Sequence, residues 1–192
     1  MIDPVLLPSA HAIAVLRARL RTIPDFPKPG IRFKDITPLV GDPAALGLTL
    51  DLLAAPFVGR GLTHVVGIES RGFIFGGALA ARLGAGFVPV RKPGKLPAEV
   101  HRVAYSLEYG EAELEMHVDA ILPGSRVLVV DDLLATGGTA AATAELVRQQ
   151  QGMLAAFAFV VELDFLAGRE RLLAGAGAGT PVYSLVHVAA EE

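Results

Sequence analysis

The chain has 192 residues, of which 52% are hydrophobic and 19% charged, and it contains no cysteine. This length fits one domain with a core of its own, and this composition excludes global disorder. The lack of cysteine excludes a disulfide framework, a thiolate zinc site and a cysteine nucleophile. The formal net charge of -3 argues against a protein that coats nucleic acid.

Charge is distributed unevenly along the chain. Residues 1–95 carry 12 basic and 6 acidic side chains, whereas residues 96–192 carry 5 basic and 14 acidic ones. No secretory signal is visible, and no segment has the ~20 mostly apolar residues of a membrane-spanning helix. We therefore expect a soluble, cytoplasmic protein.

In the first half of the chain, predicted helices alternate with short apolar runs typical of buried strands. Ser9 is a candidate helix cap, and the prolines near residue 27 break the chain. In order, we expect a helix from Ser9 to about Arg21, a loop over 24–30, a helix over 43–53, a strand over 64–68, a helix over 73–83 and a strand over 86–91.

In the second half, residues 92–104 have no periodicity and predict a long loop. Residues 110–119 alternate strictly and predict a half-buried strand, with Glu111, Glu113 and Glu115 on a solvated face. Strands are further expected over 127–130, 157–161 and 181–188, with a helix over 139–150. Strands that alternate with helices predict an α/β fold with a parallel sheet.

The strongest motif is VLVVDDLLATGGT, residues 127–139, in which a buried strand leads into two carboxylates, a glycine turn and a helix. The turn gathers backbone N–H groups at the positive end of a helix dipole, which favours an anion. Gly137 and Gly138 let the anion approach the backbone, while Thr136 and Thr139 add hydroxyl donors.

The same turn lacks the lysine of a triphosphate-binding loop and does not contain G-x-G-x-x-G, so it predicts a phosphate monoester site. Asp131 and Asp132 repel phosphate and should instead accept protons from hydroxyl groups or approach a metal. A ribose 5-phosphate satisfies both halves of the motif.

This motif resembles the site for phosphoribosyl diphosphate (PRPP) in type I phosphoribosyltransferases. The stretches FPKPGIRFKDITPL (26–39), GIESRGFIFG (67–76), RKPGKLP (91–97) and YSLEYG (105–110) together resemble the adenine phosphoribosyltransferases over about residues 23–188. The resemblance implies one domain with a type I phosphoribosyltransferase fold, in which helices flank a mostly parallel sheet. It also implies a hood over about residues 1–40 and a flexible lid loop over about 92–110.

The motifs and the resemblance together assign residues to each part of the substrates. Glu108 on the lid is implied to assist removal of a proton from the purine, and Arg71 to act on the leaving pyrophosphate. The remaining candidates are Glu69, Ser70, Arg71, Arg91, Lys92 and Lys95 for pyrophosphate; Ile31, Arg32, Phe33 and Lys34 for the base; and Asp131, Asp132, Ala135, Thr136, Gly137, Gly138 and Thr139 for PRPP or AMP.

The implied activity is transfer of the 5-phosphoribosyl group from PRPP to adenine, which gives AMP and pyrophosphate in purine salvage. Mg²⁺ is the implied cofactor, with no direct ligand assigned and with Asp131 and Asp132 as candidates that act through water. A homodimer is implied, and no nucleic acid or membrane partner is expected. Two alternatives stay open: a transferase for xanthine or hypoxanthine, and a non-catalytic regulator that senses PRPP.

Overall fold

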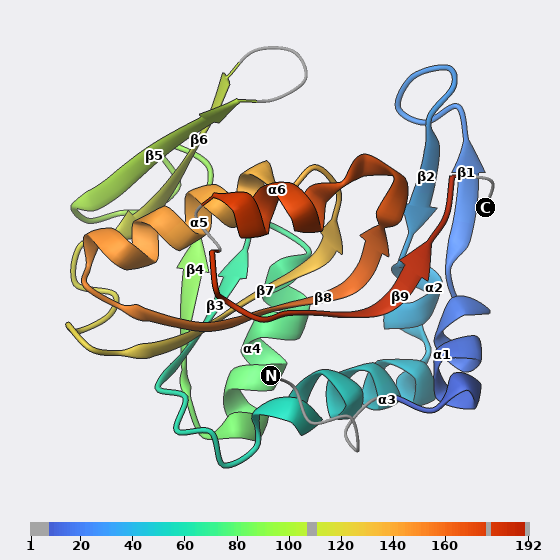
Figure 1. Cartoon of the computed structure of the whole chain (residues 1–192), viewed down its shortest axis with the longest axis horizontal. Helices are drawn as coiled ribbons and strands as arrows, with labels where there is room; N and C mark the ends of the chain where they lie inside the picture. The colour runs from blue at the N-terminus through green and yellow to red at the C-terminus, as the bar shows by residue number, and fades with distance from the viewer. Residues whose placement is uncertain (1–7, 107–110, 176–177, 191–192) are drawn as a thin grey trace.

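The computed structural model describes residues 8–106, 111–175 and 178–190. Its centre is a parallel sheet of five strands in the order β4-β3-β7-β8-β9 (Figure 1). The apolar runs predicted as strands pair here because a parallel sheet covered on both faces buries most of its side chains. The strands are β3 His64–Ile68, β4 Gly86–Val90, β7 Arg126–Leu134, β8 Met153–Leu163 and β9 Val182–Val188.

Helices cover both faces of this sheet, as Figure 1 shows. Alternation along β7 divides the core: Leu128 and Val130 pack with α3 and α4, whereas Val127 and Val129 pack with α5 and α6. The α/β prediction is therefore confirmed. The helices are α1 Ala10–Arg17, α2 Thr37–Gly41, α3 Pro43–Ala54, α4 Gly72–Leu83, α5 Gly138–Gln149 and α6 Gly168–Ala174, with 3₁₀ turns η2 Ala55–Phe57 and η3 Asp164–Leu166.

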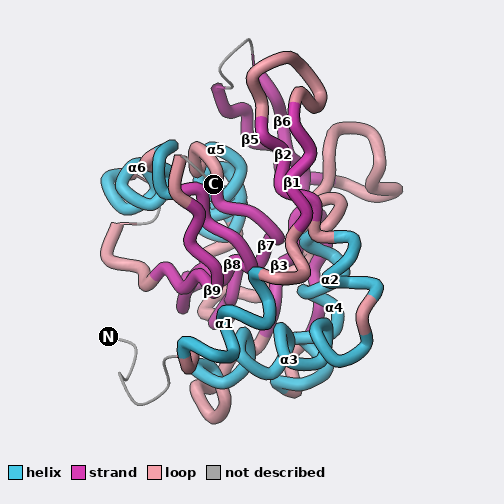
Figure 2. Tube along the Cα trace, turned by 90° about the vertical axis from the view of Figure 1, so that its right-hand side faces the viewer, coloured by secondary structure: helices cyan, strands magenta, loops and turns pink. Residues whose placement is uncertain are grey.

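A small antiparallel hairpin, β1 Arg21–Pro24 and β2 Arg32–Asp35, stands beside the main sheet near the end of β9 (Figure 2). The predicted helix through Arg21 is wrong at its end, because α1 stops at Arg17 and Arg21 opens a strand. Arg21 ion-pairs with Asp35 at 2.6 Å, which ties the two hairpin strands together.

A second antiparallel pair, β5 Val100–Ser106 and β6 Glu111–His117, packs against α5. The expected loop over 92–104 is wrong from Val100 onward, because β5 finds its hydrogen-bond partners on β6. The solvated face predicted for the glutamates of β6 is wrong at Glu115, which is 2% exposed. Its carboxylate accepts hydrogen bonds from Arg102 at 2.5 and 3.0 Å and from Gly94 N at 2.9 Å.

Two strands extend beyond their predicted ends. β7 continues through both aspartates to Leu134, and β8 continues to Leu163, because these ends pair with each other. The helices α2 and α6 were not predicted. Among the residues that the structure describes, no helix combines the length and apolar character needed to cross a bilayer.

Candidate active site

The carboxylates of Asp131 and Asp132 lie near the carboxyl end of β7, in a cavity of about 420 Å³. Open α/β sheets bind ligands beyond this edge, where strand ends and helix starts converge. The cavity collects residues from four predicted motifs. Its walls are Glu69, Ser70, Arg71, Lys92, Tyr105, Leu114, Asp131, Asp132, Leu133, Ala135 and Thr139.

Burial disfavours the charged form of both aspartates. Asp132 is 3% exposed, and its Oδ2 accepts no hydrogen bond from the described residues, although Arg71 Nε forms an ion pair with it at 3.0 Å. Burial raises the pKa of Asp132 despite Arg71. Burial and the neighbouring charge of Asp132 raise the pKa of Asp131 further. The cavity therefore holds carboxyl groups whose hydrogen-bonding capacity is only partly used.

Arg71 connects this acidic pair to the hairpin. Its guanidinium carbon lies 5.4 Å from the centre of the Phe33 ring, within the range of a cation–π contact. The turn that carries it follows a cis peptide bond between Glu69 and Ser70. At the start of α4, a Cβ on Gly72 would lie 2.9 Å from Asp131 Oδ1, so glycine permits close packing against the acidic pair.

Glu69 gathers the basic residues predicted for pyrophosphate. Its carboxylate pairs with Lys95 Nζ and accepts from Lys92 N at 3.1 Å and from Arg91 Nε at 3.4 Å. Burial raises the pKa of Glu69, but these hydrogen bonds outweigh burial and leave it lowered. The fold thus brings residues 91–95 next to the turn over 69–71, and the bonds to Glu69 hold the side chains of Arg91 and Lys95 in place.

The turn over 135–139 runs from β7 into α5. Gly137 has a φ of 82°, a left-handed conformation that suits glycine. Ala135 and Thr139 line the main cavity. Thr136, Gly137 and Gly138 line a separate pocket of about 200 Å³ that also includes Arg171 of α6.

The residues predicted for the base fall into two groups. Ile31 and Arg32 line an apolar pocket of about 330 Å³, whereas Phe33 meets Arg71 and packs edge-on against Phe26 at 5.1 Å. Lys34 Nζ donates to Thr22 Oγ1 at 2.8 Å inside the hairpin.

The backbone of Ile31 already has partners within the hairpin. Its N–H donates to Lys28 O at 3.2 Å, and its carbonyl accepts from Phe26 N at 3.3 Å. A base read by the Ile31 N–H therefore has to displace the bond to Lys28.

Comparison with known proteins identifies the family. The model of the phosphoribosyl transferase domain matches residues 52–174. An adenine phosphoribosyltransferase of Sorangium cellulosum (strain So ce56) is 69% identical over 186 residues, which are 97% of this chain and 93% of that protein. This chain belongs to the adenine phosphoribosyltransferase family.

Crystal structures of family members share the fold. The adenine phosphoribosyltransferase of Rhodothermus marinus DSM 4252 is 52% identical with a TM-score of 0.88, over 94% of this chain and 100% of that one. The Saccharomyces cerevisiae enzyme, complexed with D-2,5-dideoxy-2,5-imino-altritol 1,6-bisphosphate and adenine, is 43% identical with a TM-score of 0.84, over 92% and 99%. The predicted type I phosphoribosyltransferase fold is confirmed.

Sequence reasoning missed one wall of the apolar pocket. Leu163, Phe165 and Leu166, from the end of β8 and η3, face Ile31 and Arg32 across it. The signal available was the set of three apolar residues in ELDFL at the end of a buried strand, but the hairpin that they face lies more than a hundred residues earlier. Glu108, the lid residue implied by the family resemblance, lies outside the described residues.

Proposed function

We propose that this chain transfers the 5-phosphoribosyl group from PRPP to adenine and releases AMP and pyrophosphate, a step of purine salvage. The observation that carries the proposal is the position of Arg71. It ion-pairs with Asp132 on the proposed ribose side, contacts Phe33 on the proposed base side and lies in the turn predicted for pyrophosphate. The Arg71 guanidinium thus lies next to the residues proposed for the ribose, the base and the pyrophosphate.

The sugar phosphate would be held at the end of β7. Backbone N–H groups of residues 135–139 and the hydroxyls of Thr136 and Thr139 suit the 5-phosphate, because they lie where α5 begins. Asp131 and Asp132 would accept hydrogen bonds from the 2′ and 3′ hydroxyls. This role uses Asp132 Oδ2, which accepts no hydrogen bond from the described residues.

The leaving group would meet the basic residues organised by Glu69. As the bond from C1′ to pyrophosphate lengthens, negative charge grows on pyrophosphate and positive charge on the sugar, as in glycoside chemistry. Arg71, Lys92 and Lys95 would stabilise the former, and Asp131 and Asp132 the latter. Because Glu69 already holds Lys95 and the Lys92 backbone, part of this arrangement is preorganised.

The base would occupy the apolar pocket between the hairpin and the β8 end. Leu163, Phe165 and Leu166 supply flat apolar contact, while backbone groups of Ile31 and Arg32 would read the polar edge of adenine. Glu108 on the lid would accept the proton that the purine loses, a general-base contribution of roughly 10²–10⁴-fold.

Mg²⁺ fits the acidic pair as a cofactor. Two adjacent carboxylates, one with a buried oxygen that accepts no hydrogen bond from the described residues, form an oxygen-rich donor set. Asp131 and Asp132 would hold the ion through water. When bound, Mg²⁺ neutralises charge on the phosphate oxygens.

The decisive experiment is an assay with PRPP, Mg²⁺ and a panel of adenine, hypoxanthine and xanthine, with products separated by chromatography. We expect AMP and pyrophosphate from adenine, at a kcat/KM well above those for the other bases. Preferred turnover of hypoxanthine or xanthine would select the other transferase. PRPP binding without any turnover would select the regulator.

The proposal also includes a homodimer in the cytoplasm, and both properties rest on the family resemblance. Light scattering coupled to size exclusion should give twice the chain mass. A monomer that is fully active would contradict the dimer.

A further inference from the structure

The connection between β8 and α6, residues 163–168, adjoins both proposed substrate sites. Leu163, Phe165 and Leu166 line the apolar pocket assigned to the base. At its other end, Gly168 lies against the turn assigned to the 5-phosphate. A short segment therefore spans from one substrate site to the other.

Gly168 permits an unusually close contact with the phosphate turn. A Cβ at this position would overlap the carbonyl oxygen of Ala135 and lie 2.9 Å from its carbonyl carbon and 3.1 Å from Gly137 N. In the other direction, a Cβ on Gly137 would lie 2.6 Å from Gly168 O. Since both faces of this contact are backbone, an added methyl group must move the turn or α6.

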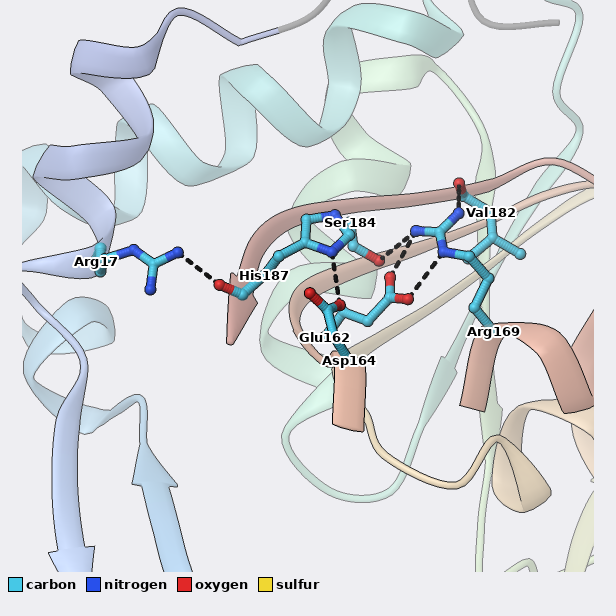
Figure 3. Close-up of polar contacts among 7 residues, drawn as sticks. All are labelled: Arg17, Glu162, Asp164, Arg169, Val182, Ser184 and His187. Carbon is cyan, nitrogen blue, oxygen red and sulfur yellow. Dashed lines mark hydrogen bonds and ion pairs between the residues drawn. The ribbon is translucent and has the colours of Figure 1, made fainter. Parts of the chain in front are cut away.

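An ion pair closes the segment at its base. Glu162 immediately precedes it and Arg169 immediately follows it, and their side chains form two bonds of 2.8 and 2.5 Å (Figure 3). Arg169 also donates to Val182 O at 2.8 Å and to Ser184 Oγ at 3.4 Å on β9. Glu162 is 4% exposed, so this fork is shielded from water on the carboxylate side.

A metal site is the competing interpretation of this cluster. Ligand atoms of Glu162, Asp164 and His187 all lie within 4.8 Å of one another. Both oxygens of Glu162 are, however, already bonded to the guanidinium of Arg169, and Asp164 bonds His187 at 2.8 Å. A metal ion would have to displace the Arg169 guanidinium from Glu162, so the cluster is better explained as an ion pair within the protein than as a metal site.

We propose that residues 163–168, closed by the Glu162–Arg169 ion pair, form a positioning segment that sets the phosphate turn and the base pocket relative to each other. Gly168 and Arg169 are positioning residues in this assignment, because neither needs to touch the reacting atoms. The inference rests on the proposed function and adds to it the means by which the sugar phosphate and the base are aligned.

The first test is Gly168→Ala, with Gly77→Ala as the matched control, since a Cβ on Gly77 meets nothing within 4 Å. A displaced phosphate turn should raise KM for PRPP about tenfold or more, because small misplacements are costly to binding and catalysis. KM for adenine at saturating PRPP should change by less than about threefold. The control should match wild type. An unchanged KM for PRPP in folded Gly168→Ala would overturn the proposal.

The second test is Arg169→Lys, which keeps the charge but loses the two-pronged geometry. Loosening the closure should raise KM for both adenine and PRPP by about three- to tenfold. The control, Arg148→Lys, alters an exposed pair with Glu145 and should leave both constants unchanged. A lower unfolding midpoint with both KM values unchanged would show a purely structural role and overturn the proposal. If Gly168→Ala does not fold, the Arg169→Lys measurement alone tests the proposal.

Failure of the proposed function can be told apart from failure of this inference. If wild type makes no AMP from adenine and PRPP, the function fails, and the phosphate-turn contact is then tested by calorimetry with ribose 5-phosphate alone. Gly168→Ala should bind this probe about tenfold more weakly than wild type and Gly77→Ala. Equal affinity in all three proteins would overturn the inference.

Discussion

Two neighbouring strands of the same sheet each carry buried carboxylates near their carboxyl ends, and the two sites differ in how that charge is compensated. On β7, burial raises the pKa of Asp131 and Asp132, and one oxygen of Asp132 accepts no hydrogen bond from the described residues. On β8, burial also raises the pKa of Glu162, but Arg169, helped by Ser184, outweighs burial and leaves the pKa lowered.

The difference separates carboxylates that keep hydrogen-bonding capacity for a ligand from a carboxylate whose bonds are made within the protein. Glu162 has both oxygens bonded to one guanidinium, so its hydrogen-bonding capacity is largely used within the protein. The β7 pair keeps capacity free at a cost in stability, as expected where a ligand completes the bonding. We therefore expect mutations in the β7 pair to act mainly on activity. Mutations in the Glu162–Arg169 pair should act mainly on stability, with the smaller changes in KM that a positioning role predicts.

The largest effect is expected from Arg169→Ala, which leaves Glu162 buried without its partner. Unfolding free energy should fall by about 3 kcal/mol, since removing one member of a buried pair strands the other charge. Urea denaturation followed by circular dichroism measures this loss. A fall of less than about 0.5 kcal/mol, which is the contribution of an exposed ion pair, would contradict the proposed difference between the carboxylates of β7 and β8.

Asp132→Asn should act on activity instead. It removes the charge that pairs with Arg71 and that is proposed to face the ribose, so kcat/KM for PRPP should fall by about tenfold or more. Steady-state kinetics at fixed adenine gives the value, with Glu145→Gln as an exposed control. An unchanged kcat/KM would refute the assignment of the acidic pair to ribose.

Asp131→Asn should stabilise the protein at neutral pH. The unfolded chain releases this proton near the ordinary pKa of 3.8, whereas the folded chain retains it to higher pH, so burial costs stability as the pH rises. The variant should raise the thermal midpoint at pH 7.5 by about 2–4 °C, and the gain should shrink toward pH 4.

Glu162→Gln should show the opposite trend with pH. Its lowered pKa contributes stability above the unfolded value of 4.5, and that contribution disappears as the pH falls through the folded value. The variant should therefore lose more stability at pH 7.5 than at pH 4. Parallel pH profiles for Asp131→Asn and Glu162→Gln would contradict the proposed difference.

The smallest effect is expected from Arg148→Ala. Its pair with Glu145 is 3.5 Å long, and the two side chains are 41% and 47% exposed. Unfolding free energy should change by less than about 0.5 kcal/mol. A loss comparable to that of Arg169→Ala would show that burial is not what distinguishes the two pairs.

Much of the β7 site could be predicted because its signals are local. A buried strand, two carboxylates and a glycine turn follow one another directly in residues 127–139. β5 was missed because its partner strand supplies the hydrogen bonds, and the alternation of β6 misplaced Glu115 because Arg102 is needed to bury its charge. The apolar pocket was found only on the hairpin side, since its other wall comes from the far end of the chain.

By itself the sequence determined the α/β class and the family, and it predicted a phosphate turn beside an acidic pair, since short-range order of residues encodes strand, turn and helix. Only the tertiary structure decided which buried carboxylates keep bonding capacity for a ligand. In the sequence, the Asp131–Asp132 pair and Glu162 each come directly after an apolar strand run. They differ because the folded chain brings both oxygens of Glu162 a two-pronged arginine, whereas the arginine beside Asp132 pairs with its Oδ2 through Nε, and compensation of a buried charge depends on such partners.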